Sequence, residues 1–168
     1  TTKGTPSISV TTGSATNITT SSVTVSATYK LINEAKMGEF GIVLSTSSYP
    51  TYYSYTKRQT SSVSPFTCEF SGLADNTTYY YRAYAKDSKG TLYYGDTKSF
   101  TTSQIPSISV TTGSATNITT SSAMVSATYE LKNGVKMEEF GILLHTSSAP
   151  TYYKFTKSKT STVSPFTC

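Results

Sequence analysis

Residues 72–102, GLADNTTYYYRAYAKDSKGTLYYGDTKSFTT, decide the fold. From position 79 to position 85 the residues alternate between two sets, which is the period-two pattern of a strand with one buried face. The buried set is predicted to be Tyr79, Tyr81, Ala83 and Ala85, opposite Tyr80, Arg82 and Tyr84. Residues 86–90 have turn chemistry, because Asp and Ser bond nearby backbone groups and Gly accepts a positive φ. Residues 91–102 are predicted to return as the second strand of a hairpin.

The rest of the first hundred residues predicts five more short strands. Apolar and polar residues alternate in several segments, and Gly, Pro, Asn and Ser mark the turns between them. These segments are residues 7–10, 23–29, 39–45, 51–57 (as an edge strand) and 65–72. Short strands at intervals of about ten residues predict an all-β fold, an antiparallel sandwich of two sheets.

Composition agrees with a β protein and excludes several classes. Of 168 residues, 36% are apolar and 14% charged, which excludes a disordered chain and a membrane-embedded one. The net charge of +5 comes from Lys and Arg residues that mostly stand singly, so no basic patch predicts a nucleic-acid partner. We also expect no direct membrane insertion and no signal peptide at the first residue, although a signal removed earlier stays open.

The chain repeats itself. Residues 6–68 and 106–168 are the same segment written twice and differ at 15 of 63 positions, which predicts a tandem array. We expect a second copy without its last two strands, because residues 106–168 stop where the hairpin would follow. The predicted parts are residues 1–5 (a linker or the end of a preceding repeat), 6–102 (first domain), 103–105 (linker) and 106–168 (incomplete second domain).

Three explanations of the incomplete copy stay open. The sequence stops short of the end of the copy, the fragment is a cleavage or cloning product, or another chain donates the missing strands by β-augmentation. Losing two of the strands should remove more stabilisation than a domain's usual margin of roughly 5 to 15 kcal/mol. If strand donation applies, the partners are other copies of this chain or neighbouring repeats.

The hairpin carries a resemblance to a known family. Leu73, Thr77 and Tyr79, the alternation behind them and the closing SFTT at residues 99–102 resemble a fibronectin type III domain. The segments FGIVLSTSSYPT (40–51) and NTTYYYRAYAKDSKG (76–90) look like the version common in surface and secreted proteins of Bacteroidetes-type bacteria. The resemblance implies tandem immunoglobulin-like sandwiches, an extracellular or cell-surface location, and a tyrosine corner at Tyr79 with Leu73 packed beneath it.

Two positions depart from the family pattern. Ala27, like Ala127 in the second copy, stands where many members bury a tryptophan, and Asp75 replaces a common proline. We expect the core to be filled instead by three aromatic residues, namely Tyr29, Phe40 and Tyr81.

The two cysteines are predicted to be structural. Cys68 and Cys168 are equivalent positions in successive copies, so their α-carbons should lie much farther apart than the roughly 7 Å limit for a disulfide. Alternation with Phe66 and Phe70 predicts that each thiol points inward as a small buried hydrophobe. An intermolecular disulfide through Cys168 is the alternative.

Tyrosines form the other candidate site. An exposed aromatic strip would stack on sugar rings or anchor a protein partner, whereas cross-strand pairing would make the same rings cover one another. Both interpretations stay open, with pairing favoured. The residues concerned are Tyr52, Tyr53, Tyr55, Tyr80, Tyr84, Tyr93 and Tyr94.

No pattern of catalytic or metal-binding residues is found. His145 is the single histidine, and no partner lies at the spacing that a dyad or a metal site needs. We expect no enzyme activity, no metal and no cofactor. Asn17, Asn76 and Asn117 stand in Asn-x-Thr sequons, and ordinary turn asparagines are favoured over glycosylation sites.

The function predicted from the sequence is a non-enzymatic extracellular structural or adhesive repeat, part of a stalk or filament. The alternative is an accessory module of a surface protein or carbohydrate-active enzyme that binds a glycan or a surface protein. A spacer within an enzyme is a third reading. The fold class hosts all three roles, so fold alone does not separate them.

Overall fold

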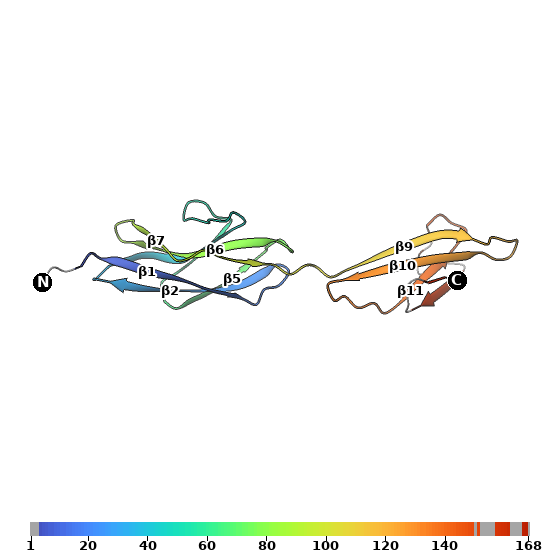
Figure 1. The fold of residues 1–168 in the computed structure, drawn as a ribbon, viewed down its shortest axis with the longest axis horizontal. Helices are drawn as coiled ribbons and strands as arrows, with labels where there is room; N and C mark the ends of the chain where they lie inside the picture. The colour runs from blue at the N-terminus through green and yellow to red at the C-terminus, as the bar shows by residue number, and fades with distance from the viewer. Residues whose placement is uncertain (1–3, 150, 152–156, 162–165, 168) are drawn as a thin grey trace. The chain divides into compact units, whose positions relative to one another are not determined.

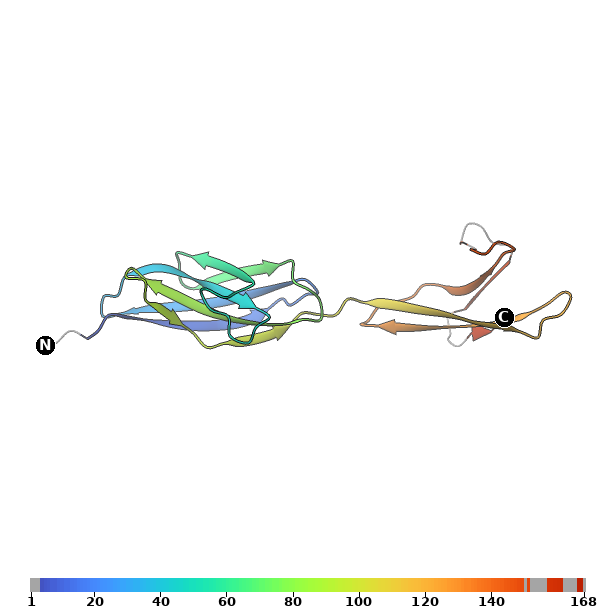
Figure 2. The ribbon, with the colours of Figure 1, turned by 90° about the horizontal axis from the view of Figure 1, so that it is seen from above.

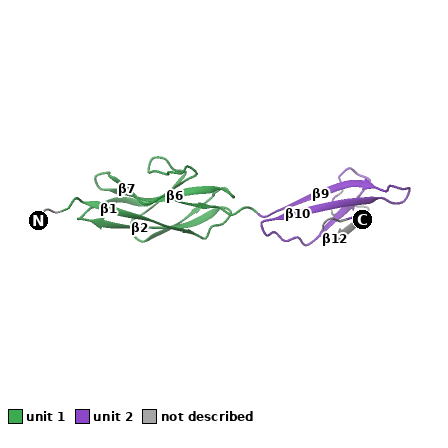
Figure 3. Ribbon diagram, in the orientation of Figure 1, with its two compact units in different colours: residues 1–105 green, residues 106–168 purple. Residues whose placement is uncertain are grey.

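The computed structural model describes residues 4–149, 151, 157–161 and 166–167. The chain divides into two compact units, Thr1–Ile105 and Pro106–Cys168, which Figure 3 shows in green and purple. The described residues form strands and no helix, so the fold is all-β. Among them, no helix has the length and apolarity needed to cross a membrane.

The first unit is an antiparallel sandwich of two sheets (Figure 1). One sheet has the order β1-β2-β5, and the other has the order β4-β3-β6-β7, with β8 also paired to β6. The strands are β1 (Ser7–Thr16), β2 (Ser22–Ile32), β3 (Met37–Ser45), β4 (Lys57–Ser61), β5 (Phe66–Ser71), β6 (Thr78–Asp87), β7 (Leu92–Tyr94) and β8 (Lys98–Thr101).

The core of this unit follows the period-two pattern. β6 buries every second residue from Tyr79 to Ala85, as the alternation predicts. These side chains meet Val23 and Val25 of β2 in the opposite sheet. Aromatic rings fill the volume around Ala27: the Tyr29 ring lies edge-on to Phe40, with ring centroids 4.8 Å apart. A core made of β-branched, alanine and aromatic residues thus does without tryptophan.

Three predicted strands differ from the structure. The strand predicted at residues 7–10 continues to Thr16, as β1. Residues 51–57 do not form an edge strand; the edge strand is β4, which begins only at Lys57. Thr51 instead closes a tight turn, in which its Oγ1 accepts the N–H groups of Tyr53 (3.3 Å) and Ser54 (3.1 Å). Such side-chain bonds to nearby backbone compete with strand pairing.

The return strand of the hairpin is also broken, into β7 and β8. Gly95 lies between the two strands and against β1, where an added Cβ would come within 2.7 Å of the Thr12 backbone nitrogen. Only a residue without a side chain fits this approach. The Gly95 carbonyl oxygen then accepts two bonds from the Arg82 guanidinium, at 3.0 and 3.2 Å. The break therefore brings the hairpin close to the facing sheet.

The turns have the predicted chemistry. In the β6–β7 turn, Asp87 Oδ1 accepts the N–H groups of Lys89 (2.9 Å) and Thr91 (2.8 Å), and Gly90 has a φ of 91°. The three sequon asparagines are exposed and also have positive φ, a conformation that Asn tolerates better than most residues. They therefore act as turn residues in this fold.

Tyr79 ties the start of β6 to the chain that precedes it. The ring is buried beside Leu73, and its hydroxyl oxygen accepts the backbone N–H of Ala74 at 3.0 Å. The bond closes a corner of five residues between the two sheets. The geometry is that of a tyrosine corner.

Tyr79→Phe removes this bond and keeps the ring. We expect the free energy of unfolding of the first unit to fall by about 0.5 to 1.5 kcal/mol, because the Ala74 N–H loses its acceptor. Urea denaturation measures the change. The matched control is Tyr49→Phe, since Tyr49 is 72% exposed, and it should change stability by less than about 0.5 kcal/mol. Equal losses for the two variants would contradict the role of the corner.

Cys68 is a half-buried free thiol that packs against the core. Burial raises the pKa of the Cys68 thiol from 9.0 to about 12, so the neutral form prevails in the folded unit. The other cysteine, Cys168, lies outside the described residues.

Slow alkylation of Cys68 is the expected consequence. In a Cys168→Ser variant at pH 8, the raised pKa should lower the thiolate fraction roughly a thousandfold, and iodoacetamide should modify Cys68 far more slowly in buffer than in urea. Mass spectrometry of the labelled chain measures both rates. Equal rates in buffer and in urea would show that the thiol is not held in the core.

Chain entry and exit lie at opposite ends of the first unit, as Figures 1 and 2 show from two directions. β1 starts at Ser7 and runs for ten residues, a length of about 33 Å. The chain leaves at Ser103, whose N–H bonds the Thr19 carbonyl oxygen at 2.9 Å, just beyond the far end of β1. The two ends of the first unit therefore lie about the length of a strand apart.

The second unit repeats the first in its described residues. One sheet has the order β13-β10-β9, and β11 pairs with β12. The strands are β9 (Ser107–Thr116), β10 (Met124–Lys132), β11 (Phe140–Leu144), β12 (Lys157–Ser161) and β13 (Phe166–Thr167). Pairing of β9 with β10 and of β11 with β12 keeps the register of the first unit.

Candidate functional site

The tyrosines do not form the exposed strip that was one of the two sequence predictions. Tyr84 is completely buried, so its assignment to a binding surface is wrong. Tyr93 packs against the core, and Tyr52, Tyr80 and Tyr94 are half-buried. Of the seven residues, Tyr53 (81%) and Tyr55 (41%) remain exposed.

The cause is a loop that folds back over the sheet. Residues 46–56, between β3 and β4, bring Tyr52 over Tyr84 on the outer face of β6, with ring centroids 5.2 Å apart. The hydroxyl oxygen of Tyr94 accepts the backbone N–H of Tyr52 at 2.9 Å and so fixes the loop to β7. Alternation along β6 gives the face of Tyr84 correctly, but this loop adds a layer on that face.

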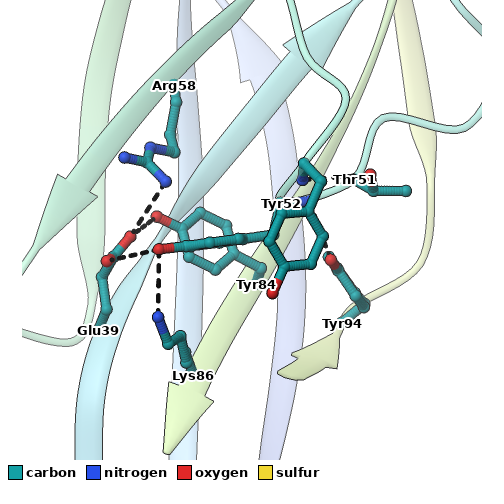
Figure 4. Close-up of polar contacts among 8 residues, drawn as sticks. Glu39, Thr51, Tyr52, Arg58, Tyr84, Lys86 and Tyr94 are labelled. Carbon is teal, nitrogen blue, oxygen red and sulfur yellow. Dashed lines mark hydrogen bonds and ion pairs between the residues drawn. The ribbon is translucent and has the colours of Figure 1, made fainter. Parts of the chain in front are cut away.

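Glu39 lies at the centre of the contacts under this loop (Figure 4). Its Oε2 accepts the hydroxyl of Tyr52 at 3.2 Å, and its Oε1 accepts the hydroxyl of Tyr84. Arg58 Nη1 lies 3.7 Å from the same Oε1. A single carboxylate therefore connects the loop, β6 and β4.

Cations lie against the Tyr52 ring. The Arg58 guanidinium carbon and the Lys86 ammonium nitrogen each lie 4.9 Å from its centroid. Lys86 Nζ also lies 3.4 Å from the Tyr52 hydroxyl oxygen. A second pair of the same kind joins Arg82 to the Tyr94 ring at 4.2 Å. Contacts between a cation and an aromatic face each contribute about 0.5 to 1 kcal/mol at partly exposed sites.

Burial sets the protonation state of the central phenol. It raises the pKa of Tyr84, and the hydrogen bond and charge of Glu39 raise this pKa further. Tyr84 is therefore a neutral hydrogen-bond donor to the carboxylate at neutral pH. The arrangement holds a loop in place; every polar group named here has a partner inside the unit.

Sequence reasoning missed the charged members of this cluster, Glu39, Arg58 and Lys86. Glu39 is the one acidic residue of β3, and its role depends on the pairing of Gly41 with Tyr84 across β3 and β6. An added Cβ at Gly41 would clash with the Gln59 carbonyl oxygen of β4 and would lie 3.0 Å from the Tyr84 hydroxyl oxygen, so this glycine makes room for both the neighbouring strand and the ring. A glycine two residues after the one acidic residue of an apolar strand is the signal that was available in the sequence.

The second copy keeps part of the cluster. Glu139 and Gly141 correspond to Glu39 and Gly41, whereas Ser158 replaces Arg58. The equivalents of Tyr52 and Tyr55 lie outside the described residues.

Two further features of the described part of the chain are its potential metal ligands and its single histidine. Within residues 4–149, 151, 157–161 and 166–167, no three His, Cys, Asp or Glu residues gather as a metal site would need. The His145 Nδ1 accepts the backbone N–H of Ser147 at 2.8 Å. This bond is local to the loop after β11.

Comparison with known proteins gives a distant likeness to a solved structure. No family model and no characterised protein matches the chain. Among solved structures, the chain is similar to the sensor domain of the anti-sigma factor RsgI4 from Pseudobacteroides cellulosolvens. The TM-score is 0.44, the sequence identity is 16%, and the match covers 58% of this chain and 96% of that one.

Proposed function

We propose that the chain is part of a tandem array of fibronectin type III-like sandwiches that serves as an extracellular structural or adhesive stalk. The observation that carries this proposal is the position of the chain ends in the first unit. The chain enters at Ser7 and leaves at Ser103, at opposite ends of β1. A module with this geometry adds length each time it is repeated, and it needs no chemistry to do so.

The tyrosine cluster fits the same role. The hydroxyls of Tyr52 and Tyr84 bond Glu39, and the Tyr94 hydroxyl bonds the loop backbone. Tyrosines that are used internally stabilise a sheet face instead of offering it to a ligand. In this proposal residues 106–168 are a second copy of residues 6–68.

Small-angle X-ray scattering of engineered arrays tests the stalk. Chains of one, two and three copies of residues 6–105 should increase in maximum dimension by about 35 Å with each copy. Copies that fold back on one another would leave the maximum dimension nearly constant and would contradict the stalk.

A second candidate function is glycan or protein binding by the loop over the sheet. Tyr49 (72% exposed) and Tyr53 (81% exposed) both stand on this loop, and flat aromatic rings stack on sugars or anchor partners. In this function, the contacts of Glu39 with Tyr52 and Tyr84 would hold the loop that carries the two exposed rings. Glycan-array screening of the chain and of a Tyr49→Ala/Tyr53→Ala variant tests this. Binding that the double variant loses would favour this function, and no binding by the unmodified chain would remove it.

A further inference from the structure

The second unit has an apolar face that is covered in the first unit. Ile8 is 4% exposed, whereas its equivalent Ile108 is 43% exposed; Leu44 is 0% exposed, and its equivalent Leu144 is 55% exposed. Thr112 is likewise exposed where Thr12 is buried. The residue type is the same at each of these positions. The difference therefore comes from what lies against the face.

The backbone that carries this face is the same in both units. β9 pairs with β10 as β1 pairs with β2, and the register shift after Thr112 repeats the one after Thr12. β11 pairs with β12 in the register of β3 with β4. Within the described residues, β12 is the one strand paired with β11, whereas β3 pairs with both β4 and β6. In the part of the chain that the structure describes, this face therefore has the backbone of its counterpart in the first unit and no strand in the place of β6.

The first unit shows what covers such a face. Residues of β6 pair with β3 along its length, from Met37 to Ser45. Across the sandwich, the Ala83 N–H bonds Thr12 Oγ1 at 3.0 Å, and the Tyr81 hydroxyl bonds the Gly13 carbonyl oxygen at 3.2 Å. The hairpin of residues 72–102 therefore contacts both sheets at once.

The groups that receive this hairpin recur in the second unit. Thr112 and Gly113 correspond to the acceptors on β1, and Gly141 corresponds to the glycine that makes room for the Tyr84 ring. Glu139 corresponds to the acceptor of the Tyr84 hydroxyl. The second unit therefore has the hydrogen-bond acceptors, the glycine beside which a tyrosine ring fits, and the apolar side chains against which the hairpin would pack.

From this match we infer that the face formed by β9, β10 and β11 is an acceptor site for a β-hairpin with the chemistry of residues 72–102. Its first strand alternates tyrosine and alanine on the inward side, and it seats in the register that β6 has in the first unit. The inference rests on the internal repeat and not on the stalk function. If the maximum dimension of the arrays in small-angle X-ray scattering did not increase with each copy, the stalk proposal would fail and the acceptor site would still stand.

A synthetic peptide of residues 72–102, added to the 168-residue chain, tests the site. Amide hydrogen exchange followed by mass spectrometry should slow at least about tenfold in residues 140–144, since the equivalent strand β3 pairs with β6 in the first unit and strand pairing protects amides. A peptide with Ala83→Asp should give no protection, because position 83 faces the core and is 0% exposed. A peptide with Lys98→Ala, changed at an exposed position, should protect as well as the unmodified one.

Three results would overturn the inference. The first is unchanged exchange in the second unit at peptide concentrations up to about millimolar. The second is equal protection by the Ala83→Asp peptide. The third is a dimer mass for the chain alone with protection that the peptide does not alter, which would assign the face to a second copy packed against it.

A fused variant removes any dependence on the solubility of the peptide. Residues 69–102 are appended after Cys168, so that the hairpin follows the second copy as it follows the first. Leu144→Ala should then lower the urea midpoint of the second unit as strongly as Leu44→Ala lowers that of the first. A fused chain in which Leu144→Ala still has no effect would contradict the acceptor site.

Discussion

Leu44→Ala is expected to lower the free energy of unfolding of the first unit by about 2 to 5 kcal/mol. Leu44 is 0% exposed and lies on β3 between the two sheets. Truncation removes buried apolar surface and leaves a cavity that the surrounding strands fill only in part. Urea denaturation, followed through resolved amide resonances of the first unit, measures the loss.

The same chain contains a matched control for this prediction. Leu144 occupies the equivalent place on β11 and is 55% exposed, so Leu144→Ala in the unextended chain should cost less than about 1 kcal/mol. The two leucines are the same residue type and lie in the same strand register. They differ only in whether the β6 hairpin covers the side chain. Similar losses in both units would contradict the assignment of the β6 hairpin as the cover of the first.

Glu39→Ala is expected to destabilise the first unit by about 1 to 3 kcal/mol. Tyr84 is fully buried, and removing the carboxylate leaves its hydroxyl without the acceptor that it has now. Tyr52 and Arg58 lose their contact with the same group, so the loop of residues 46–56 should also exchange its amides faster. Urea denaturation and hydrogen exchange measure the two effects.

Two comparisons separate this role from a general charge effect. Glu69 is exposed on β5, and Glu69→Ala should change stability by no more than about 0.5 kcal/mol. Tyr84→Phe combined with Glu39→Ala should cost less than the sum of the two single changes, because both remove the same bond. Additive losses in the double variant would show that the two residues are not coupled.

The sequence predicts the first strand and the turn of the hairpin well because their signals are local. Alternation from Tyr79 to Ala85 fixes the inward face, and Asp87 with Gly90 fixes the turn. The missing tryptophan at Ala27 correctly predicts a core filled by Tyr29 and Phe40. The strand face and the turn depend on neighbours within a few residues, whereas the contact between Tyr29 and Phe40 joins β2 and β3 across the two sheets.

The candidate site was harder to predict because it depends on contacts between distant segments. Period-two alternation assigns Tyr84 to the outer face, but it does not show that residues 46–56 cover that face. The turn at Thr51 uses side-chain bonds that compete with strand formation, so the tyrosines after it stand on a loop. Glu39 becomes the centre of the cluster only once β3, β4 and β6 are side by side.

Pulling a single chain from its two ends tests the central claim, that residues 6–102 are a self-contained sandwich that holds its ends apart. The first unit is expected to resist force and then to unfold in one step, with a gain in length of about 300 Å for its 97 residues. Gradual extension without such a step would contradict it.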